Sequence, residues 1–210
     1  MALMEKGLAF ALTEIGLDDK PAWFLTLSPY AKVPLLRHGE AVIYESAVIN
    51  EYIEEVFPEH PLLPPDPVRR AEARLWIDFA NVRFIPPIYR LLMSQEAQTQ
   101  ARQRERLDAA FSRMEAHLAG RRGGAFWLGD ALGLADLAFY PHLERFCALE
   151  YYRDYGIPKA CGRMRAWLEL IRSRPSAASV AKPDDLYVRN WAKYAGGGGD
   201  GTTAHDMREM

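Results

Sequence analysis

The chain has 210 residues, of which 49% are hydrophobic and 26% charged, and its formal net charge at pH 7 is -2. This composition is typical of one large or two small globular domains, and the charge balance gives no electrostatic reason to expect binding to nucleic acid or to an anionic membrane surface. No apolar run approaches the roughly 18 residues that a membrane-spanning helix needs, and the N-terminus lacks a secretory signal pattern, so we expect a cytoplasmic protein.

The first part of the chain mixes short strand and helix patterns. Residues 1–7 have the pattern of the end of a helix, because a lysine and then a glycine close the segment, and residues 8–12 have the pattern of a strand. Residues 20–24 predict a short helix entered through proline. Residues 33–44 predict a β-hairpin, and residues 45–57 predict a helix with one apolar face.

Residues 58–67 contain five prolines, and we interpret them as a linker that is neither helix nor sheet. Beyond the linker the apolar periodicity is helical. It predicts helices from Pro67 toward Asn81 with a bend or break at Pro86-Pro87, over about 96–119, from about 134 to 146 with a kink at Pro141, after Pro158, and over 184–195. Residues 196–210 contain little apolar material and are predicted to be disordered.

Neither the cysteines nor the histidines have the spacing of a metal site. Cys147 and Cys161 lie 14 residues apart and match no CxxC or zinc pattern, and no two histidines are four residues apart. We therefore expect two reduced thiols in a helical core and no metal. We interpret the charged run at residues 102–106 as a solvated helix face.

Three segments carry a resemblance to a known family: KPAWFLTLSPYAKVPLL, AVIYESAVINEYIEE and GDALGLADLAFYPHLERF. They resemble the glutathione S-transferase family, omega-type and related bacterial members above all. The resemblance implies an α+β fold, with a thioredoxin-like domain over residues 1–57, a linker over 58–67 and an all-helical domain over 68–195. It also implies a detoxifying enzyme that either conjugates glutathione to a small hydrophobic electrophile or carries out glutathione-dependent thiol exchange. A homodimer is implied too, with each small domain against its partner's helical one.

Glutathione is an anionic tripeptide with a free α-amino group, so its site needs anion donors, an acceptor for the amine and a backbone edge. Helix N-terminal amides with Ser46 suit a carboxylate, and Glu45 suits an ammonium group. The resemblance implies that this pair holds the γ-glutamyl end, that the Val33-Pro34 bond is cis with the Val33 backbone on the cysteinyl part, and that Lys20 reaches the glycyl end. The alternatives are a plain helix cap, a proline at a sheet edge and a solvated lysine.

The helical part contributes two further expectations. Asp136 follows Gly133, where the family usually has Ser or Thr, so we expect a structural helix cap that is weaker than usual. A hydrophobic substrate pocket would draw on aromatic residues of the helical domain, although core packing is the alternative explanation for such a stripe. These residues are Phe84, Tyr89, Tyr187 and Trp191.

No residue matches the family's thiol-activating residue, which is cysteine in omega-type members and serine or tyrosine elsewhere. The family has a strand and a turn before the helix that residues 1–7 resemble. We therefore leave the catalytic residue unknown, expect the first domain to be incomplete, and interpret Met1 as an internal methionine. Ser28-Pro29 imitates an active-site pair, but its place just before Val33 assigns it to a loop. The alternative function is a non-catalytic interaction module similar to stringent starvation protein A.

Overall fold

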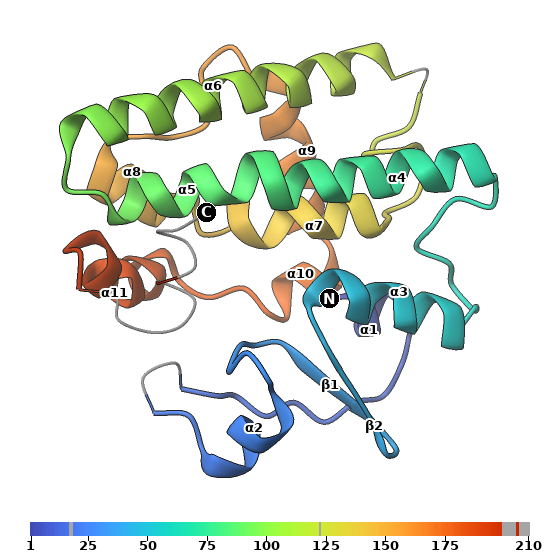
Figure 1. The fold of residues 1–210 in the computed structure, drawn as a ribbon. Helices are drawn as coiled ribbons and strands as arrows, with labels where there is room; N and C mark the ends of the chain where they lie inside the picture. Colours follow the sequence, from blue (N-terminus) through green and yellow to red (C-terminus); the bar gives the residue numbers. More distant parts are fainter. Residues whose placement is uncertain (17–18, 122, 199–204, 206–210) are drawn as a thin grey trace.

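The computed structural model describes residues 1–16, 19–121, 123–198 and 205. A small part with a two-stranded sheet and short helices lies below a larger bundle of helices (Figure 1). The chain passes from one to the other through residues 57–66, which form no helix or strand. This order, a mixed α+β part followed by an all-helical part, agrees with the predicted fold class.

A β-hairpin forms the sheet of the small part. Strand β1 (Leu35–His38) runs antiparallel to β2 (Ala41–Tyr44), with Leu35 opposite Tyr44. The turn between them contains Gly39 at a φ of 60°, a left-handed value that glycine adopts without a steric penalty. The predicted hairpin is confirmed.

Three helices accompany the hairpin: α1 (Ala2–Glu5), α2 (Ala22–Leu27) and α3 (Ser46–Val56). Helix α1 stops where the sequence predicts, because Gly7 has a φ of 67° that an α-helix cannot continue. Helix α2 begins directly after Pro21, and α3 begins directly after β2. These three predictions are confirmed to within three residues at each end.

The strand predicted over Leu8–Leu12 is wrong, because residues 8–16 form no regular element. A strand forms only where a neighbour bonds its backbone N–H and C=O groups. Within the part of the chain that the structure describes, β1 and β2 pair only with each other, so residues 8–12 have no ladder to join. Phe10 and Leu12 are accordingly 43% and 74% exposed.

The long helix after the linker changes its winding instead of breaking. Asp66 caps it by accepting a hydrogen bond from the Arg69 backbone N–H at 2.9 Å, and α4 (Pro67–Phe79) leads into a π-helical turn, η1 (Ala80–Phe84). Helix α5 (Ile85–Met93) follows with Pro86-Pro87 in its first turn. Prolines are tolerated in a first turn because they lack an N–H to donate.

The remaining helices follow the predicted order, with two differences. The helix expected over 134–146 ends at Leu143, two residues after Pro141, and a second helix begins at Phe146. A short helix at Pro175–Ala178 was not expected. The helices are α6 (Ala97–Gly120), α7 (Leu134–Leu143), α8 (Phe146–Arg153), α9 (Gly162–Arg172), α10 (Pro175–Ala178) and α11 (Asp184–Ala195). The predicted disorder at 196–210 lies largely outside the described residues.

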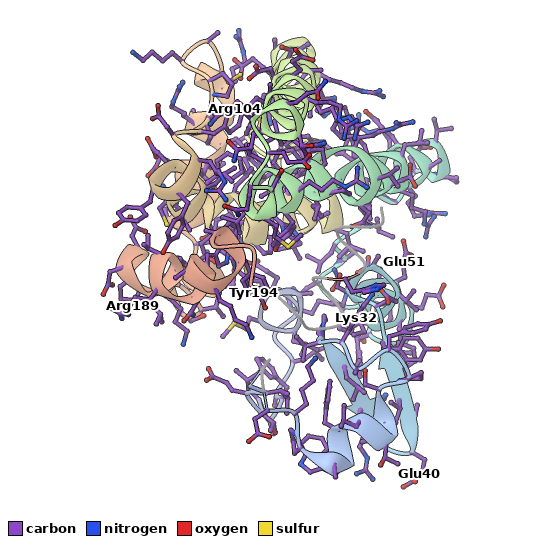
Figure 2. The ribbon with its side chains drawn as sticks, turned by 60° about the vertical axis from the view of Figure 1, so that its left-hand side comes forward. Lys32, Glu40, Glu51, Arg104, Arg189 and Tyr194 are labelled. Carbon is purple, nitrogen blue, oxygen red and sulfur yellow. The ribbon has the colours of Figure 1, made fainter. Side chains whose placement is uncertain are left out.

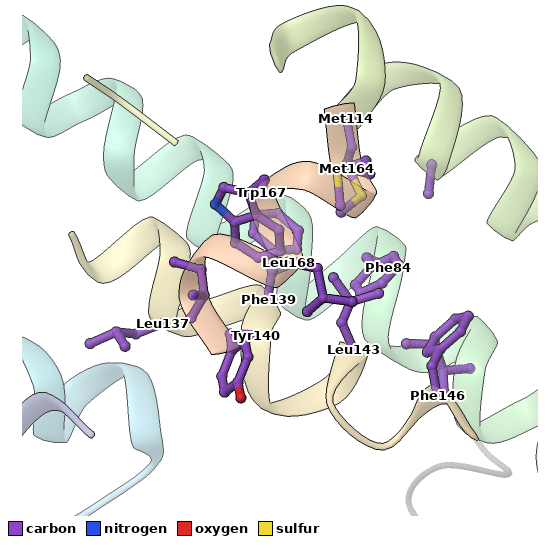
Figure 3. Packing of buried hydrophobic residues seen from close by; sticks show 14 of the residues in the cluster. Phe84, Met114, Leu137, Phe139, Tyr140, Leu143, Phe146, Met164, Trp167 and Leu168 are labelled. Atoms are coloured by element: carbon purple, nitrogen blue, oxygen red, sulfur yellow. The ribbon is translucent and has the colours of Figure 1, made fainter. Parts of the chain in front are cut away.

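An aromatic core fills the helical part. Trp127 stacks on Phe139 with ring centroids 4.3 Å apart, and Phe84 packs against Phe139 at 5.6 Å and parallel to Phe146 at 6.4 Å. Figure 3 shows Phe84, Phe139 and Trp167 converging from three different helices. Large aromatic side chains bury much apolar area each, so this cluster supplies a large share of the bundle's stability.

Asp136 is buried in this core. Its carboxylate accepts hydrogen bonds from the Gly133 N–H at 2.9 Å, the Trp127 N–H at 2.9 Å and the Trp167 indole Nε1–H at 2.7 Å. Burial raises the pKa of Asp136 to about 6, while the bond from Trp167 and the backbone donors act in the opposite direction. The indole bond ties α7 to α9, which a simple helix cap would not do.

Both cysteines belong to the helical part and neither is in a disulfide. Cys161 is buried and Cys147 half-buried. Burial raises the pKa of both thiols, that of Cys147 to about 11, so they are protonated at neutral pH. Among the described residues, none of the helices combines the length with the apolar composition that spanning a membrane requires.

Helix α1 joins the small part to the helical one through charged side chains. Lys6, whose side chain is 0% exposed, donates to Glu54 of α3 at 2.7 Å, and Glu54 also accepts from the Leu62 and Leu63 backbone N–H groups of the linker. Glu5 accepts two hydrogen bonds from the Arg174 guanidinium, at 2.9 and 2.6 Å, and one from the Ser176 hydroxyl.

The Glu5 junction predicts a pH-dependent contribution to stability. The hydrogen bond from Arg174 lowers the pKa of Glu5 below its usual value, so its stabilisation is present above about pH 4.5 and is lost as the pH falls through the lowered pKa. We expect Glu5→Gln to reduce the free energy of unfolding at pH 7 by about 1–2 kcal/mol and to have a smaller effect at pH 3, where part of this stabilisation is already lost. Urea denaturation at both pH values measures this.

Glu169→Gln is the matched control, because Glu169 pairs with Arg172 only three residues away and its side chain is 70% exposed. It should change the free energy of unfolding by well under about 1 kcal/mol at either pH. An equal loss for both variants would contradict the assignment.

Candidate functional site

A small recess lies at the corner where the hairpin leads into α3. Its volume is about 70 Å³, and we refer to it as the corner recess. Figure 2 shows Lys32, one of its lining residues, on the α3 side of the small part, with Glu40 at the opposite tip of the hairpin. The lining residues are Ser28, Tyr30, Lys32, Val33, Pro34, Tyr44, Glu45 and Ser46.

One wall of the corner recess is the turn before β1. The Val33-Pro34 peptide bond is cis, as the sequence resemblance implied. Val33 lies beyond the last ladder pair, Leu35–Tyr44, and its side chain is 44% exposed. The backbone of Val33 therefore continues the line of the sheet outside the hairpin, where a ligand with peptide groups can lie alongside it.

The opposite wall is the start of α3. Glu45 has φ 66° and ψ 117°, a combination that residues other than glycine rarely adopt, and it turns β2 into α3 with no intervening loop. Such a conformation costs about 1–3 kcal/mol and is typically kept where function requires it. No side chain of the described residues caps α3, so the helix presents its first N–H groups beside Ser46 to an outside anion.

Sequence reasoning missed the aromatic and basic groups of this recess. The Lys32 ammonium lies 5.9 Å from the centre of the Tyr30 ring, and the Tyr30 and Tyr44 rings meet edge to face at 5.5 Å. Their positions in the sequence carried a signal, because Lys32 directly precedes Val33 and Tyr44 directly precedes Glu45. Together they give the recess a cation and a flat apolar side.

Ser28 also lines the recess, but its hydroxyl is engaged by its own loop. It donates to the Lys32 carbonyl at 3.0 Å and accepts from the Lys32 N–H at 3.1 Å, and the residue is 3% exposed. These bonds close the loop ahead of Val33-Pro34. They support the assignment of Ser28-Pro29 to a loop and not to an active-site turn.

The residues predicted for glutathione are not all brought together. The recess gathers Val33, Pro34, Glu45 and Ser46, whereas Lys20 is half-buried and is not among the lining residues. Lys32 occupies the place of a lining cation instead. The role of Lys20 stays a prediction.

The residues predicted for a substrate pocket lie in the helical part. Phe84 is fully buried among other aromatic rings, which favours the alternative of core packing for it. Tyr89 lies 5.6 Å from Trp191 between ring centres, and its hydroxyl is 3.4 Å from His142 Nδ1. Tyr187 and Trp191 are 8% and 7% exposed. Burial lowers the pKa of His142 to about 3, so the imidazole of His142 is neutral at pH 7.

The corner recess offers one coherent kind of chemistry. Helix N–H groups and a hydroxyl suit a carboxylate, the Glu45 carboxylate suits an ammonium group, and the Val33 backbone suits a peptide. A water molecule occupies about 30 Å³, so the recess has room for one end of a peptide-sized ligand, and the rest must lie along the surface. In the described residues, no cluster of three or more His, Cys, Asp or Glu side chains could hold a metal ion.

Two family models match the chain. A model described as the glutathione S-transferase N-terminal domain matches residues 1–56, and one described as the C-terminal domain matches residues 97–170. The first covers the corner recess, and the second covers α6 to α9.

Relatives and solved structures agree with these models. The chain is 30% identical over 189 residues to a probable glutathione S-transferase MSR-1 of Nicotiana plumbaginifolia, covering 89% of this chain and 84% of the relative. It is 29% identical to rat glutathione S-transferase omega-1, covering 85% and 73%. The structure resembles that of rice GST1 in complex with glutathione, with a TM-score of 0.82, 26% identity and coverage of 95% and 90%. It also resembles glutathione transferase Omega 3C of Trametes versicolor, with a TM-score of 0.80, 28% identity and coverage of 92% and 82%.

The backbone of Glu45 gives a prediction that does not depend on any ligand. Glycine adopts its φ without strain and alanine does not, so Glu45→Gly should be more stable than Glu45→Ala by about 1 kcal/mol. Both variants remove the same carboxylate, so only the backbone distinguishes them. Chemical denaturation of the two purified variants measures the difference.

Ala47 in the first turn of α3 is the control, because its backbone is helical and Ala47→Gly should cost about 0.5–1 kcal/mol. If glycine also proved less stable than alanine at position 45, the strain assigned to that corner would be absent.

Proposed function

The chain belongs to the glutathione S-transferase family, and we propose that it binds glutathione at the corner recess between Val33-Pro34 and Glu45-Ser46. The single observation that carries the proposal is the juxtaposition of these two dipeptides in one recess. They are ten or more residues apart in sequence, and each contributes a different group that a γ-glutamyl peptide needs.

The γ-glutamyl end of glutathione is the part that the recess suits. Its carboxylate accepts hydrogen bonds from the N–H groups at the start of α3 and from the Ser46 hydroxyl. Its ammonium group donates to the Glu45 carboxylate. The cysteinyl part lies along the Val33 backbone as a short added strand. Lys32 is the lining cation nearest to this path, and we assign it to the glycyl carboxylate in place of Lys20.

The chemistry follows from the family. Its relatives are named glutathione S-transferases of plant and omega type, and the protein is an enzyme of this kind. Such an enzyme either conjugates glutathione to an electrophile or carries out glutathione-dependent thiol exchange. We propose small hydrophobic electrophiles as substrates and their detoxification as the role, with Tyr89, Tyr187 and Trp191 nearest the electrophile. The thiol needs a donor that lowers its pKa, and we assign no residue to that task.

We also propose a homodimer. Helix α4 and η1 carry Val68, Leu75 and Val82 seven residues apart, and these side chains are 75%, 69% and 54% exposed. Seven residues are two helical turns, so the three form an apolar stripe. A second copy of the chain would cover it, with the small part of each copy against the helices of the other.

Glutathione binding tests the proposal directly. We expect Ser46→Ala and Glu45→Gln each to weaken the binding of glutathione about tenfold, because each removes one charge-assisted contact worth about 1.4 kcal/mol. Isothermal titration calorimetry of the purified chain measures this, and turnover of a chlorinated nitrobenzene gives a second readout.

Ser173→Ala serves as the control, since Ser173 is an exposed serine at the end of α9 and far from the recess. Wild-type affinity in all three variants would place glutathione elsewhere and overturn the proposal.

The dimer has its own test. Leu75→Glu places a charge in the middle of the stripe, and we expect it to convert the protein to a monomer in analytical ultracentrifugation. Tyr151→Glu on α8 is the control, because Tyr151 is 71% exposed and lies outside the stripe. A wild-type protein that sediments as a monomer would contradict the dimer without affecting the glutathione site.

A further inference from the structure

One arginine side chain joins the ends of three helices. Arg153 is the last residue of α8, and its guanidinium donates hydrogen bonds to carbonyls at the ends of α5, α8 and α11. These helices meet at one end of the bundle, on the left in Figure 1. The acceptors are the backbone carbonyls of Leu91 at 3.0 Å, Tyr152 at 3.0 Å, Ser94 at 3.3 Å, Ala195 at 2.7 Å and Leu92.

Arginine suits this position because of its charge and its number of donors. The last four carbonyls of an α-helix have no partner within the helix, and the aligned peptide dipoles give that end a partial negative charge. A guanidinium is positively charged and carries five N–H donors in a planar fork. Among the described residues, the hydrogen-bond acceptors of Arg153 are all backbone carbonyls, so its partners are the helix ends themselves.

A second donor reaches the same carbonyl of α11. The side-chain amide of Gln95 donates to the Ala195 carbonyl at 2.8 Å and to the Met93 carbonyl at 3.0 Å, so it also bridges α5 and α11. Gln95 is exposed, whereas Arg153 is half-buried. We refer to Arg153 and Gln95 together as the helix-end clasp.

The backbone that carries Arg153 is itself held in place from α6. Asp154 follows with a φ of 48°, a left-handed value that ends α8. Arg104 of α6 donates to the carbonyls of Arg153 and Asp154. The sequence predicted a solvated helix face over residues 102–106, and the structure corrects this at Arg104 and at Gln103, which is completely buried. The side chain of Arg153 therefore reaches α11 from a fixed backbone.

Helix α11 buries little of its own surface. Its buried side chains are Tyr187, Trp191 and Ala195, which are four residues apart on one face, and most of its other residues are exposed. The Tyr152 hydroxyl of α8 adds a hydrogen bond to the Val188 carbonyl at 2.9 Å. Segments with few buried contacts open locally at a low free energy. We therefore expect the helix-end clasp to have a large share in keeping α11 against α5.

The clasp lies one helical turn from the aromatic residues assigned to the electrophile. Trp191 is four residues before Ala195, so the two lie one turn apart on the same face of α11. The Trp191 ring is 5.6 Å from that of Tyr89, which is two residues before Leu91 on α5. A shift of the last turn of α11 relative to α5 would therefore change the spacing between Trp191 and Tyr89.

The simplest alternative is that Arg153 only stabilises the bundle. Its loss would then loosen all the helices alike, and it would weaken the binding of every ligand to the same extent. Its acceptors favour a more local role, because α5 and α11 are the two helices that carry Tyr89 and Trp191.

We propose that Arg153 is a positioning residue for the electrophile, because it holds the end of α11 at a fixed spacing from α5. It acts through Trp191 and Tyr89 and is not itself a contact of the substrate. This role rests on the substrate pocket proposed above, and it does not depend on which groups bind glutathione at the corner recess.

Hydrogen exchange of the unliganded chain tests the clasp. In Arg153→Gln we expect the amides of α11 to exchange at least about tenfold faster, with those of α6 and α7 unchanged within about twofold. Arg189→Gln is the matched control, because Arg189 is exposed on α11 and pairs with Asp185 of the same helix. Unchanged exchange of α11 in Arg153→Gln, or an equal rise in all the helices, would overturn the proposal.

A pair of ligands tests the consequence for the substrate. S-hexylglutathione differs from glutathione only in an apolar chain on the sulfur, and isothermal titration calorimetry of the wild-type chain should show it bound at least about tenfold more tightly. Arg153→Gln should reduce this advantage to about threefold or less and leave glutathione affinity unchanged within about twofold. An unchanged advantage, an equal loss for both ligands, or equal affinities in the wild type would overturn the proposal.

Gln95→Ala gives a second variant in case Arg153→Gln does not fold, because it removes the other donor of the clasp from an exposed position. We expect exchange of α11 to rise about threefold and the advantage of S-hexylglutathione to fall about twofold. Wild-type behaviour in both measurements would overturn the proposal. A wild-type chain that binds neither ligand would contradict the glutathione site instead, and the exchange of α11 would then decide on the clasp.

Discussion

The register of one short hairpin determines where the proposed glutathione site lies. Because Leu35 is opposite Tyr44, the residues that continue each strand beyond this pair, Val33-Pro34 and Glu45-Ser46, come to lie side by side. A shift of the strand register by one residue would move each side chain of the shifted strand to the opposite face of the sheet. It would also move Glu45 away from Val33. The positive φ of Glu45 then starts α3 at once, so the helix N-terminus opens onto the corner and not into a loop.

This corner is held in place by contacts outside it. Glu54 of α3 accepts hydrogen bonds from Lys6 and from the linker backbone, and Glu5 is bonded to Arg174 and Ser176 near α10. Because the Lys6 ammonium is fully buried, its partner must stay in position, or a buried charge would be left unpaired. The helical bundle thereby fixes the orientation of α3, and α3 in turn fixes the donors that it presents at its N-terminus.

Local rules predicted much of this molecule, and the failures share a cause. The hairpin and the end of α1 at Gly7 follow from residues close together in sequence, and both are confirmed. The strand at Leu8–Leu12 failed because pairing depends on a distant partner. The sequence also overlooked Lys32, since side-chain direction in a loop is set by tertiary contacts such as the bonds from Ser28.

The measurement closest to the central claim is a crystal structure of the chain grown with millimolar reduced glutathione. The account predicts a γ-glutamyl carboxylate at the N-terminus of α3 beside Ser46, its ammonium group on Glu45, and the cysteinyl peptide bonded to the Val33 backbone. Glutathione ordered elsewhere, with the corner occupied by solvent or by the protein's own side chains, would contradict it.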